Sequence, residues 1–308
     1  MKVLVTGGAG YVGAVLVPRL LADGHDVVVF DSLRSGGQTL LPYFQDQRFS
    51  FIRGDVTDRD AVRRGVEQAD AVVHLAAIVG FPACRKYPAL ASVTNVDGTR
   101  NVVAALNPQQ PLVYASSGSN YGRLETVCTE ESPLNPVSLY AITKAEAELI
   151  ALEAPQCTAL RFATAFGVSP RLRLDLLIND FVHQAVVNKQ IIVYERSFRR
   201  TFIHVRDMAR AISFALGNIE RMRGESYNVG HESLNLTKEQ VALKIRERIP
   251  YYLHFAEVGH DDDLRDYEVS YTKIRQLGFE TAMSLDEGIA ELIRAMDLVE
   301  FVSPYTNT

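Results

Sequence analysis

The sequence has few cysteines and no long apolar run, and each shortage excludes a class of protein. Its three cysteines, Cys84, Cys128 and Cys157, are odd in number and form no Cys-x-x-Cys motif. They fit neither a disulfide framework nor a zinc pattern and are typical of free thiols in a reducing compartment. The longest apolar run, 71–80, is far too short to span a bilayer, and the first residues lack the shape of a signal peptide. We therefore expect a cytoplasmic protein that is not inserted in a membrane.

Positively charged residues are fewer than negatively charged ones. Lysine and arginine number 32 against 37 acidic residues, which gives a formal net charge of −5. This balance argues against general nucleic-acid binding. Three adjacent acids, Asp261, Asp262 and Asp263, cannot all face one ion, so we expect a solvated loop there and no metal site. With 308 residues, 47% of them hydrophobic, the chain can bury one large core or two modest ones.

The first stretch of the chain organises the rest. The apolar run 3–5 predicts a buried strand, and three glycines, Gly7, Gly10 and Gly13, follow at intervals of three before an apolar helical pattern begins at Val12. Gly7 suits a tight turn, Gly10 a close approach to a pyrophosphate, and Gly13 close packing of helix on strand. A helix N-terminus favours anions. The stretch therefore predicts a dinucleotide site, with an unoccupied glycine-rich turn as the alternative.

A second strand, 27–30, ends in Asp31. A carboxylate at that point accepts hydrogen bonds from an adenosine ribose and repels a 2′-phosphate. We therefore expect NAD in preference to NADP, although Arg34 close by is the feature that an NADP-dependent reductase would use.

Strands and helices alternate through the first half. Further strands are predicted at 49–52, 71–77 and 112–115, and helices at 88–106 and 138–152. This alternation predicts an α/β fold, a doubly wound parallel sheet of the Rossmann type, with a smaller α/β substrate-binding part. We assign residues 1–168 to the NAD-binding domain, with 190–230 returning to it, and 169–189 and 231–308 to the substrate-binding part.

Polar residues at strand ends are the first candidates for a site. Asp55 follows the third strand, where it can meet the adenine or simply form a turn. Ala76 and Ala77 leave room for a ligand at the end of the fourth strand, whereas His74 within it is better explained as a core histidine.

A helix beginning near Ser138 carries Tyr140 and Lys144, four residues apart and therefore on one face. An ammonium beside a phenol lowers the phenol pKa and makes it a usable acid or base. The preceding strand ends in Ser116 and Ser117.

Together these residues resemble the extended short-chain dehydrogenase/reductase superfamily, in its NAD-dependent epimerase/dehydratase branch that acts on nucleotide sugars. The turn 6–13, the segment 74–77, Asn95 within 94–99, Ser117 ahead of Tyr121-Gly122, and the Tyr-x-x-x-Lys pair carry the likeness, which covers almost the whole chain.

The resemblance implies a catalytic set of Ser117, Tyr140 and Lys144. The cofactor-binding residues that it implies are Gly7, Gly10, Tyr11, Val12, Gly13, Asp31, Asp55, Val56, Leu75, Ala76, Ala77, Asn95, Tyr140 and Lys144. Tyr140 would take the proton of a sugar hydroxyl while its carbon gives hydride to NAD. Its expected substrate-binding residues are Ser117, Ser119, Thr164, Asn179, Arg200 and Arg265. The two arginines suit a diphosphate because each guanidinium can bind two oxygens; as an alternative, either is a packing or surface residue.

Two departures from the family pattern bear on the reaction. Its 4,6-dehydratases carry an acid two residues after the catalytic Ser or Thr, where this chain has Ser119. Dehydration is therefore disfavoured. At Thr164 many relatives have asparagine, so the chain departs from the family pattern at a position of substrate contact.

Three segments, 128–134, 169–176 and 265–267, resemble more narrowly a branch that includes GDP-heptose C4 dehydrogenases. We expect an NAD-dependent enzyme that oxidises C4 of a nucleotide-diphosphate sugar. The expected net reaction is 4-epimerisation, with release of the 4-keto sugar by a C4 dehydrogenase as the alternative, and a non-catalytic NAD-binding sensor as the alternative of another class. The family also implies a homodimer paired through helices 88–106 and 138–152.

Overall fold

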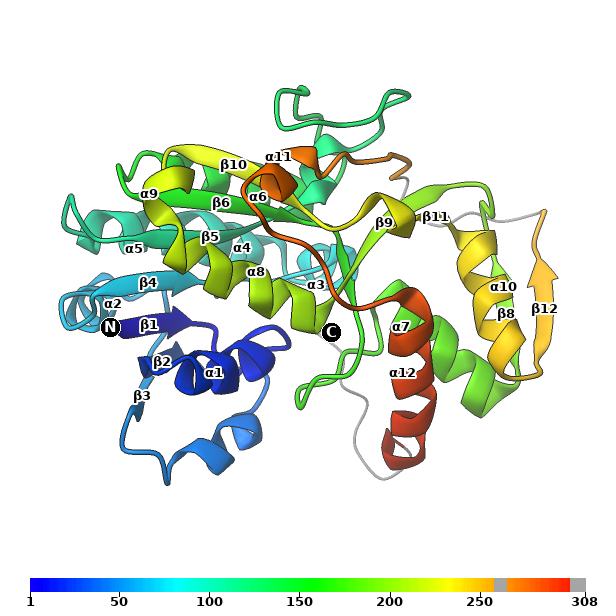
Figure 1. Cartoon of the computed structure of the whole chain (residues 1–308), viewed down its shortest axis with the longest axis horizontal. Helices are drawn as coiled ribbons and strands as arrows, with labels where there is room; N and C mark the ends of the chain where they lie inside the picture. Colours follow the sequence, from blue (N-terminus) through cyan, green and yellow to red (C-terminus); the bar gives the residue numbers. More distant parts are fainter. Residues whose placement is uncertain (258–264, 300–308) are drawn as a thin grey trace.

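The computed structural model describes residues 1–257 and 265–299, so Asp261, Asp262 and Asp263 lie outside the described part. Figure 1 shows a three-layer sheet domain and, beside it, a smaller part built around α7, α10 and α12. Within the described ranges, the helices are all too short or too polar to cross a membrane.

The larger part is organised by a seven-stranded sheet in the order β10-β6-β5-β4-β1-β2-β3. Its neighbouring strands are all parallel. The strands β2 and β3 lie on one side of β1, and β4 and the later strands lie on the other, so the topological switch point is between β1 and β4. Ligands of open α/β sheets bind at this point. The strands are β1 (Lys2–Thr6), β2 (Asp26–Asp31), β3 (Phe49–Arg53), β4 (Ala71–His74), β5 (Leu112–Ser117), β6 (Cys157–Phe162) and β10 (Glu225–Val229). The predicted doubly wound α/β fold is confirmed.

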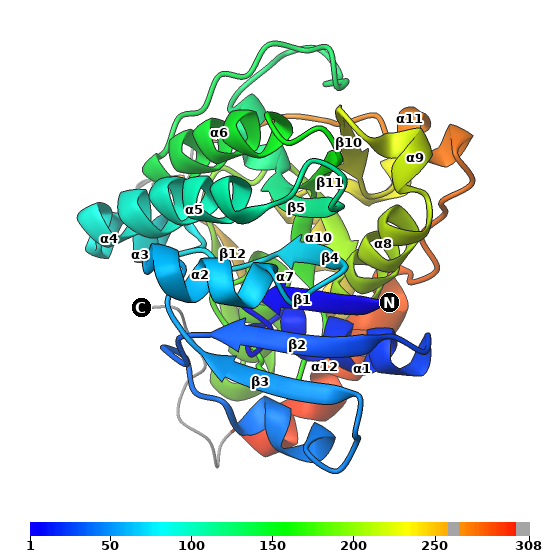
Figure 2. The same cartoon turned by 90° about the vertical axis from the view of Figure 1, so that its left-hand side faces the viewer.

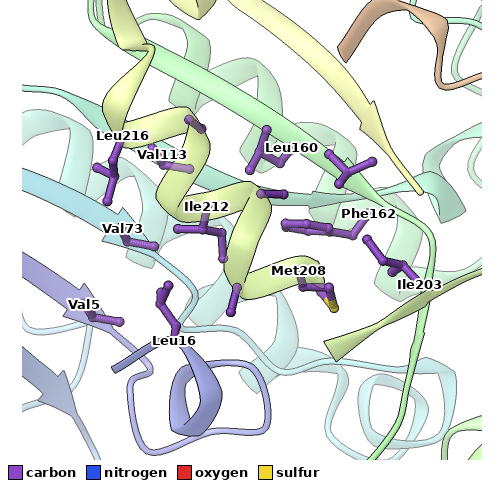
Figure 3. Packing of buried hydrophobic residues seen from close by; sticks show 14 of the residues in the cluster. Val5, Leu16, Val73, Val113, Leu160, Phe162, Ile203, Met208, Ile212 and Leu216 are labelled. Atoms are coloured by element: carbon purple, nitrogen blue, oxygen red, sulfur yellow. The ribbon is translucent and has the colours of Figure 1, made fainter. Parts of the chain in front are cut away.

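Both faces of the sheet are covered, which explains the unbroken apolar runs of its strands. Val3 and Val5 of β1 belong to one buried cluster and Leu4, between them, to another on the opposite face. Figure 2 shows α1 and α8 on one side and α2, α5 and α6 on the other. In Figure 3, Ile212 and Leu216 of α8 pack over the strands. The covering helices are α1 (Gly13–Ala22), α2 (Arg59–Val66), α5 (Gly98–Ala105), α6 (Leu139–Leu152) and α8 (Val205–Gly217).

The two helices predicted in the first half form, with one difference. Ser138 caps α6 by accepting a hydrogen bond from the Ala141 amide. The segment predicted as one helix over 88–106 consists instead of α4 (Pro88–Ser92), a π-helical turn, η2 (Val93–Asp97), and α5. The π turn places Thr94 and Asn95 on the buried side.

The pattern in the sequence misses β6 and β10, because buried polar residues interrupt their apolar runs. Arg161 of β6 forms an ion pair with Glu148 of α6, with 2.6 Å between Nη2 and Oε1. Glu148 also accepts hydrogen bonds from Ser116 and from Ser226 of β10. An arginine in a strand usually indicates exposure, but here a buried carboxylate on another element compensates its charge.

The smaller part has a hydrophobic cluster of its own. Its sheets are β7-β9-β11 and β8-β12. The segment predicted to return to the first domain is divided: β8 pairs with β12, whereas α8 and β10 lie with the large sheet. The elements not yet bounded are α3 (Phe81–Lys86), β7 (Thr164–Phe166), α7 (Leu177–His183), β8 (Gln190–Val193), β9 (Arg199–His204), α9 (Ile219–Met222), β11 (Asn235–Thr237), α10 (Lys238–Arg248), β12 (Tyr252–Phe255), α11 (Thr272–Gln276) and α12 (Leu285–Val299).

Candidate active site

One cavity runs along the carboxyl ends of the parallel strands and continues against the smaller part. The first half of the chain lines it with the turn after β1, with Asp31 after β2, with 75–81 after β4, and with Ser117, Tyr140 and Lys144. The second half lines it with 162–165, Arg171, Arg173 and Arg265. The predicted catalytic and cofactor residues therefore share this cavity, with the exception of Asn95.

The turn after β1 has the backbone that a dinucleotide needs. Gly7 has a φ of +73°, and a Cβ there would lie 2.7 Å from the amide nitrogen of Ala76. A Cβ on Gly13 would lie 2.5 Å from Cα of Gly8. Both positions exclude any larger residue, so the strand and helix α1 approach closely and leave a cradle without side chains at the helix N-terminus, beside Val12. This cradle fits the pyrophosphate of NAD.

Tyr11, within this turn, points its side chain toward the smaller part. Its hydroxyl donates a 2.6 Å hydrogen bond to the carbonyl of Gly167, and its own carbonyl accepts one from Ser169 at 2.7 Å. Burial raises the pKa of the Tyr11 phenol, so it stays neutral. Tyr11 thus couples the cofactor turn to the loop that follows β7.

Asp31 is held at the end of β2 by two backbone donors, the amides of Ala9 at 3.0 Å and Leu33 at 2.8 Å. Burial raises its carboxyl pKa, and these two hydrogen bonds act against that rise. Arg34 lines the cavity nearby, with its guanidinium 5.0 Å from the ring centre of Tyr87. The carboxylate is therefore fixed where a ribose of NAD would lie, and the arginine stacks on an aromatic ring.

Most residues after β3 and β4 line the cavity, and one of them also stabilises a turn. Val56, Leu75, Ala76 and Ala77 line the cavity, as does Asp55, whose carboxylate also accepts hydrogen bonds from the amide and hydroxyl of Thr57. Both interpretations of Asp55 are thus compatible with its position.

His74 is buried between two hydroxyls, with 2.6 Å from Nδ1 to Oγ1 of Thr6 and 3.0 Å from Nε2 to Oγ1 of Thr99. Burial lowers its pKa to about 3, so it is neutral. These contacts agree with the prediction of a core histidine.

Ser117 and Tyr140 both line this cavity, and the Ser117 hydroxyl acts to lower the pKa of the Tyr140 phenol. Ser117 also accepts a hydrogen bond from the Ser119 amide at 3.1 Å. The expectation that Lys144 lowers the Tyr140 pKa is wrong for the protein without ligands: burial raises that pKa, outweighing the hydrogen bond from Ser117 and the charges of Arg173 and Arg265.

Burial also changes the pKa of Lys144 itself. Burial lowers the Lys144 pKa to about 7, although the Glu148 carboxylate acts in the opposite direction. Its ammonium lies 4.2 Å from the ring centre of Tyr114. A lysine that is only partly protonated near neutral pH provides less positive charge to the phenol than the spacing in the sequence suggests.

Asn95 lies behind the cavity wall. Its side-chain oxygen accepts from the Ile78 amide at 2.7 Å, and its nitrogen donates to the Ile78 carbonyl and to Thr143, each at 3.0 Å. The residue therefore fixes the loop after β4 against α6.

The predicted substrate residues fall into two groups. Ser117, Ser119, Thr164 and Arg265 line the cavity, and Arg265 donates a 2.5 Å hydrogen bond to the Ser119 hydroxyl. Oγ1 of Thr164 is buried and has no hydrogen-bond partner among the described residues.

The other two, Asn179 and Arg200, lie outside the cavity lining. Asn179 is fully buried and bonds to the backbone of Gly167 and Arg173. Arg200 is only 1% exposed, and its Nη1 donates to the carbonyl of Arg199.

The prediction missed two cavity residues, Arg171 and Arg173, both less than 9% exposed. They lie two apart in the loop after β7, in the segment 169–176 that carried the narrower family likeness. That likeness was the available signal, because arginines in a loop otherwise indicate a solvent-exposed surface.

Comparison with known proteins agrees with this geometry. The model of the "NAD dependent epimerase/dehydratase family" matches residues 3–230. The low-salt glycan biosynthesis protein Agl12 of Haloferax volcanii is 32% identical over 306 residues, which cover 94% of this chain and 96% of that protein. The dTDP-glucose 4,6-dehydratase of an Actinoplanes species is 31% identical, covering 95% and 97% of the two chains.

Among solved structures, the UDP-glucose 4-epimerase of Thermus thermophilus, in complex with NAD, superposes with a TM-score of 0.83 at 26% identity and covers 96% of this chain and 99% of its own. The matched proteins thus carry the names of two net reactions, dehydration and epimerisation. Membership of this family accounts for the glycine turn, for Asp31 at the end of β2, and for the presence of Ser117 and Tyr140 in one cavity. The chain belongs to the NAD-dependent epimerase/dehydratase family and is an NAD-dependent enzyme of the nucleotide-sugar type.

Proposed function

We propose that the protein oxidises C4 of a nucleotide-diphosphate sugar with NAD and reduces the resulting ketone again, so that its net reaction is 4-epimerisation. The observation that carries the proposal is that Ser117, Tyr140 and Lys144 line the same cavity as the cofactor turn. The acids among the described lining residues are Asp31 and Asp55, which belong to the cofactor end.

The side chains of this chain have distinct roles in the proposed reaction. Tyr140, as phenolate, takes the proton of the C4 hydroxyl, and Ser117 donates a hydrogen bond to the same oxygen. Bound NAD supplies the acceptor, and later the donor, of the hydride. Lys144, one helical turn after Tyr140, lines the same cavity and would hold the nicotinamide ribose of the cofactor.

The residues that follow the catalytic serine favour epimerisation over dehydration. Loss of water from the keto sugar requires an acid and a base to move the C5 proton and expel the C6 hydroxyl. Gly118 and Ser119 follow Ser117, and the Ser119 hydroxyl is engaged by Arg265. Neither Gly118 nor Ser119 can act as a carboxylic acid.

A C4 dehydrogenase that releases the keto sugar is the second candidate. It is supported by the cavity position of Arg171 and Arg173, because these residues belong to the segment that resembles the GDP-heptose branch. This enzyme would need a separate step to reoxidise NADH.

Mass spectrometry and absorbance distinguish the candidates. The NAD-loaded protein is incubated with UDP-, GDP-, CDP- and dTDP-sugars, heptoses included. A product of unchanged mass with a new retention time and no net NADH supports epimerisation. A product two mass units lighter, with NADH accumulating, means C4 oxidation alone, and a product lighter by the mass of one water would contradict both.

For the diphosphate we propose Arg265 as the main contact. It lines the cavity and lies against Ser119, two residues after the catalytic serine. A guanidinium there can bind two phosphate oxygens at once. Arg200 and Asn179 stay predictions as direct contacts, since the cavity lining does not include them.

We also propose a homodimer formed through the segment that contains α4, η2 and α5 and through α6, which contacts all three. Ile142 and Leu149, seven residues apart on one stripe of α6, are 47% and 64% exposed, and Val93 of η2 is 42% exposed. Burying such a stripe is favourable. Leu149→Lys should convert the protein to monomers in sedimentation at micromolar concentration; a wild-type protein that sediments as a monomer would contradict the proposal.

A further inference from the structure

The loop after β7 brings an ion pair to the cavity wall. Arg173 and Asp175 are joined by two hydrogen bonds, Nε to Oδ1 at 3.1 Å and Nη2 to Oδ2 at 2.7 Å. Their side chains are only 10% and 13% exposed. A two-pronged contact between planar groups fixes the orientation of the guanidinium, which a single contact or a mobile surface arginine would not.

The backbone of this loop is fixed as well. The carbonyl of Arg173 accepts a 2.8 Å hydrogen bond from Asn179 in α7. At the other end of the loop, Ser169 donates to the carbonyl of Tyr11, and Tyr11 donates to that of Gly167. The loop is thus attached both to α7 and to the cofactor turn, so that Arg173 has a defined position relative to bound NAD.

Arg173 lies close to the reacting centre. Its Nη2 is 3.2 Å from the position that a Cβ on Gly80 would occupy, and Gly80 belongs to the cavity-lining loop after β4. Its charge lowers the pKa of the Tyr140 phenol and also that of the Cys84 thiol. The charge of Arg265 also lowers the Tyr140 pKa, but Arg265 is bonded to Ser119. The two arginines therefore approach the reacting centre with different partners, Asp175 for Arg173 and Ser119 for Arg265.

The chemistry of the pair indicates what it can recognise. Asp175 occupies Nε and one Nη2 hydrogen, while Nη1 has no hydrogen bond to any residue that the structure describes. Because the aspartate neutralises the guanidinium, the pair favours an uncharged hydroxyl over a second phosphate or a carboxylate.

We propose that Arg173 is a specificity-determining residue that donates a hydrogen bond to a sugar hydroxyl near the oxidised carbon, and that Asp175 is its positioning residue. This inference rests on the proposed function, because it requires the sugar of a nucleotide sugar to lie beside Tyr140. A site that pairs with a hydroxyl discriminates strongly against ligands that lack it, since its own polar group is then left unpaired.

The test measures binding separately from turnover. NAD-loaded Tyr140→Phe protein is titrated calorimetrically with UDP-glucose, dTDP-glucose and GDP-mannose and with their 2-, 3- and 6-deoxy forms, and the titrations are repeated with Arg173→Gln, Arg173→Lys and Asp175→Asn added. Arg275→Gln is the matched control, because Arg275 makes a similar two-pronged pair with Glu232, at 3.0 and 2.8 Å, away from the cavity.

With Arg173 present, removal of one particular hydroxyl should weaken binding by about 10- to 100-fold, the range of a hydrogen bond to a charged group. In Arg173→Gln the same removal should cost about 2-fold or less, as expected of coupled partners. Arg173→Lys should recover part of the discrimination, Asp175→Asn should lose part, and Arg275→Gln should match the parent. Three results would overturn the inference. In the first, Arg173→Gln discriminates among the deoxy sugars as the parent protein does, and in the second it loses the same affinity for every nucleotide sugar tested. The third result is a parent protein that binds none of the nucleotide sugars.

Turnover by the wild-type enzyme separates this result from the proposed function. Arg173-dependent hydroxyl discrimination without any C4 oxidation would retain the inference and contradict the function. C4 oxidation without such discrimination would do the reverse.

Discussion

The cofactor end and the substrate end of the cavity are built in different ways. The cofactor end is built on one continuous strand, turn and helix, 2–22, and on the ends of β2, β3 and β4 beside it in the same parallel sheet. The substrate end is assembled from Ser119, Arg173 and Arg265, which are far apart in sequence. Local backbone geometry therefore determines the first, whereas the second depends on how the smaller part packs against the sheet.

This difference separates binding of the cofactor from binding of the substrate. Variants at the cofactor end should change the affinity for NAD and leave the discrimination among sugars unchanged. Variants at the substrate end should do the opposite. Tyr140 lies where the two ends meet and should affect chemistry alone.

The largest effect is expected for Tyr140→Phe. Loss of the phenolic acid/base should reduce kcat by about 10³-fold, within the usual range for general acid–base catalysis, while NAD affinity stays within about 2-fold. Single-turnover kinetics and an NAD titration measure the two quantities. Tyr43→Phe, outside the cavity lining, is the matched control and should keep full activity. Unchanged turnover in Tyr140→Phe would refute the proposed mechanism.

The next effect concerns the cofactor turn. In Gly13→Val the new Cβ would lie 2.5 Å from Cα of Gly8, so helix and strand must separate. At the usual cost of overpacking, about 1–3 kcal/mol, NAD should bind about 10- to 100-fold more weakly in calorimetry. Gly217→Ala is the control, because a Cβ there has nothing within 4 Å. Tight NAD binding by Gly13→Val would show that the close approach is not required.

At the substrate end, Arg265→Gln should raise KM for the nucleotide sugar by about 10-fold and change kcat by less than about 2-fold, because a phosphate contact binds ground state and transition state alike. Steady-state kinetics at saturating NAD measure both constants. Ser119→Ala removes its partner and should change KM less. A loss of NAD affinity with an unchanged KM would mean that Arg265 belongs to the cofactor end.

The last prediction concerns the pH dependence of stability. The Lys144 pKa is about 7 in the folded protein, below its ordinary value near 10.5, because of burial. Between these two values the unfolded chain binds more protons, so this residue makes the free energy of unfolding rise with pH, by up to about 1.4 kcal/mol per pH unit.

Lys144→Met should abolish this contribution. Urea unfolding of the protein freed of NAD, at pH 7, 8 and 9, measures it as the difference between the wild type and the variant. Parallel pH profiles for the two proteins would mean that Lys144 keeps its ordinary pKa.

Much of the fold could be predicted because its signals are local. Each apolar run that predicts a strand from β1 to β5 consists of a few consecutive residues, and Ser138 lies next to the helix α6 that it caps. The strand β6 could not be identified in this way, because Arg161 becomes compatible with burial only through Glu148, 13 residues earlier on another element. In the sequence alone, a buried arginine whose charge is compensated by a distant carboxylate cannot be distinguished from an exposed arginine.

The site shows the same limit. Tyr140 and the glycines were found from their spacing and Ser117 from the family resemblance, whereas Arg171 and Arg173 were not identified as cavity residues. Their loop becomes a wall of the cavity only after Tyr11 and Ser169 join it to the cofactor turn.

The sequence by itself determined the glycine turn, the parallel sheet and the shared helix face of Tyr140 and Lys144, because backbone sterics and helical periodicity act over a few neighbouring residues. Only the tertiary structure decided which arginines enter the cavity and that the Tyr140 pKa is raised. Burial and charge depend on groups that the fold brings together from distant positions, and no local pattern records their sum.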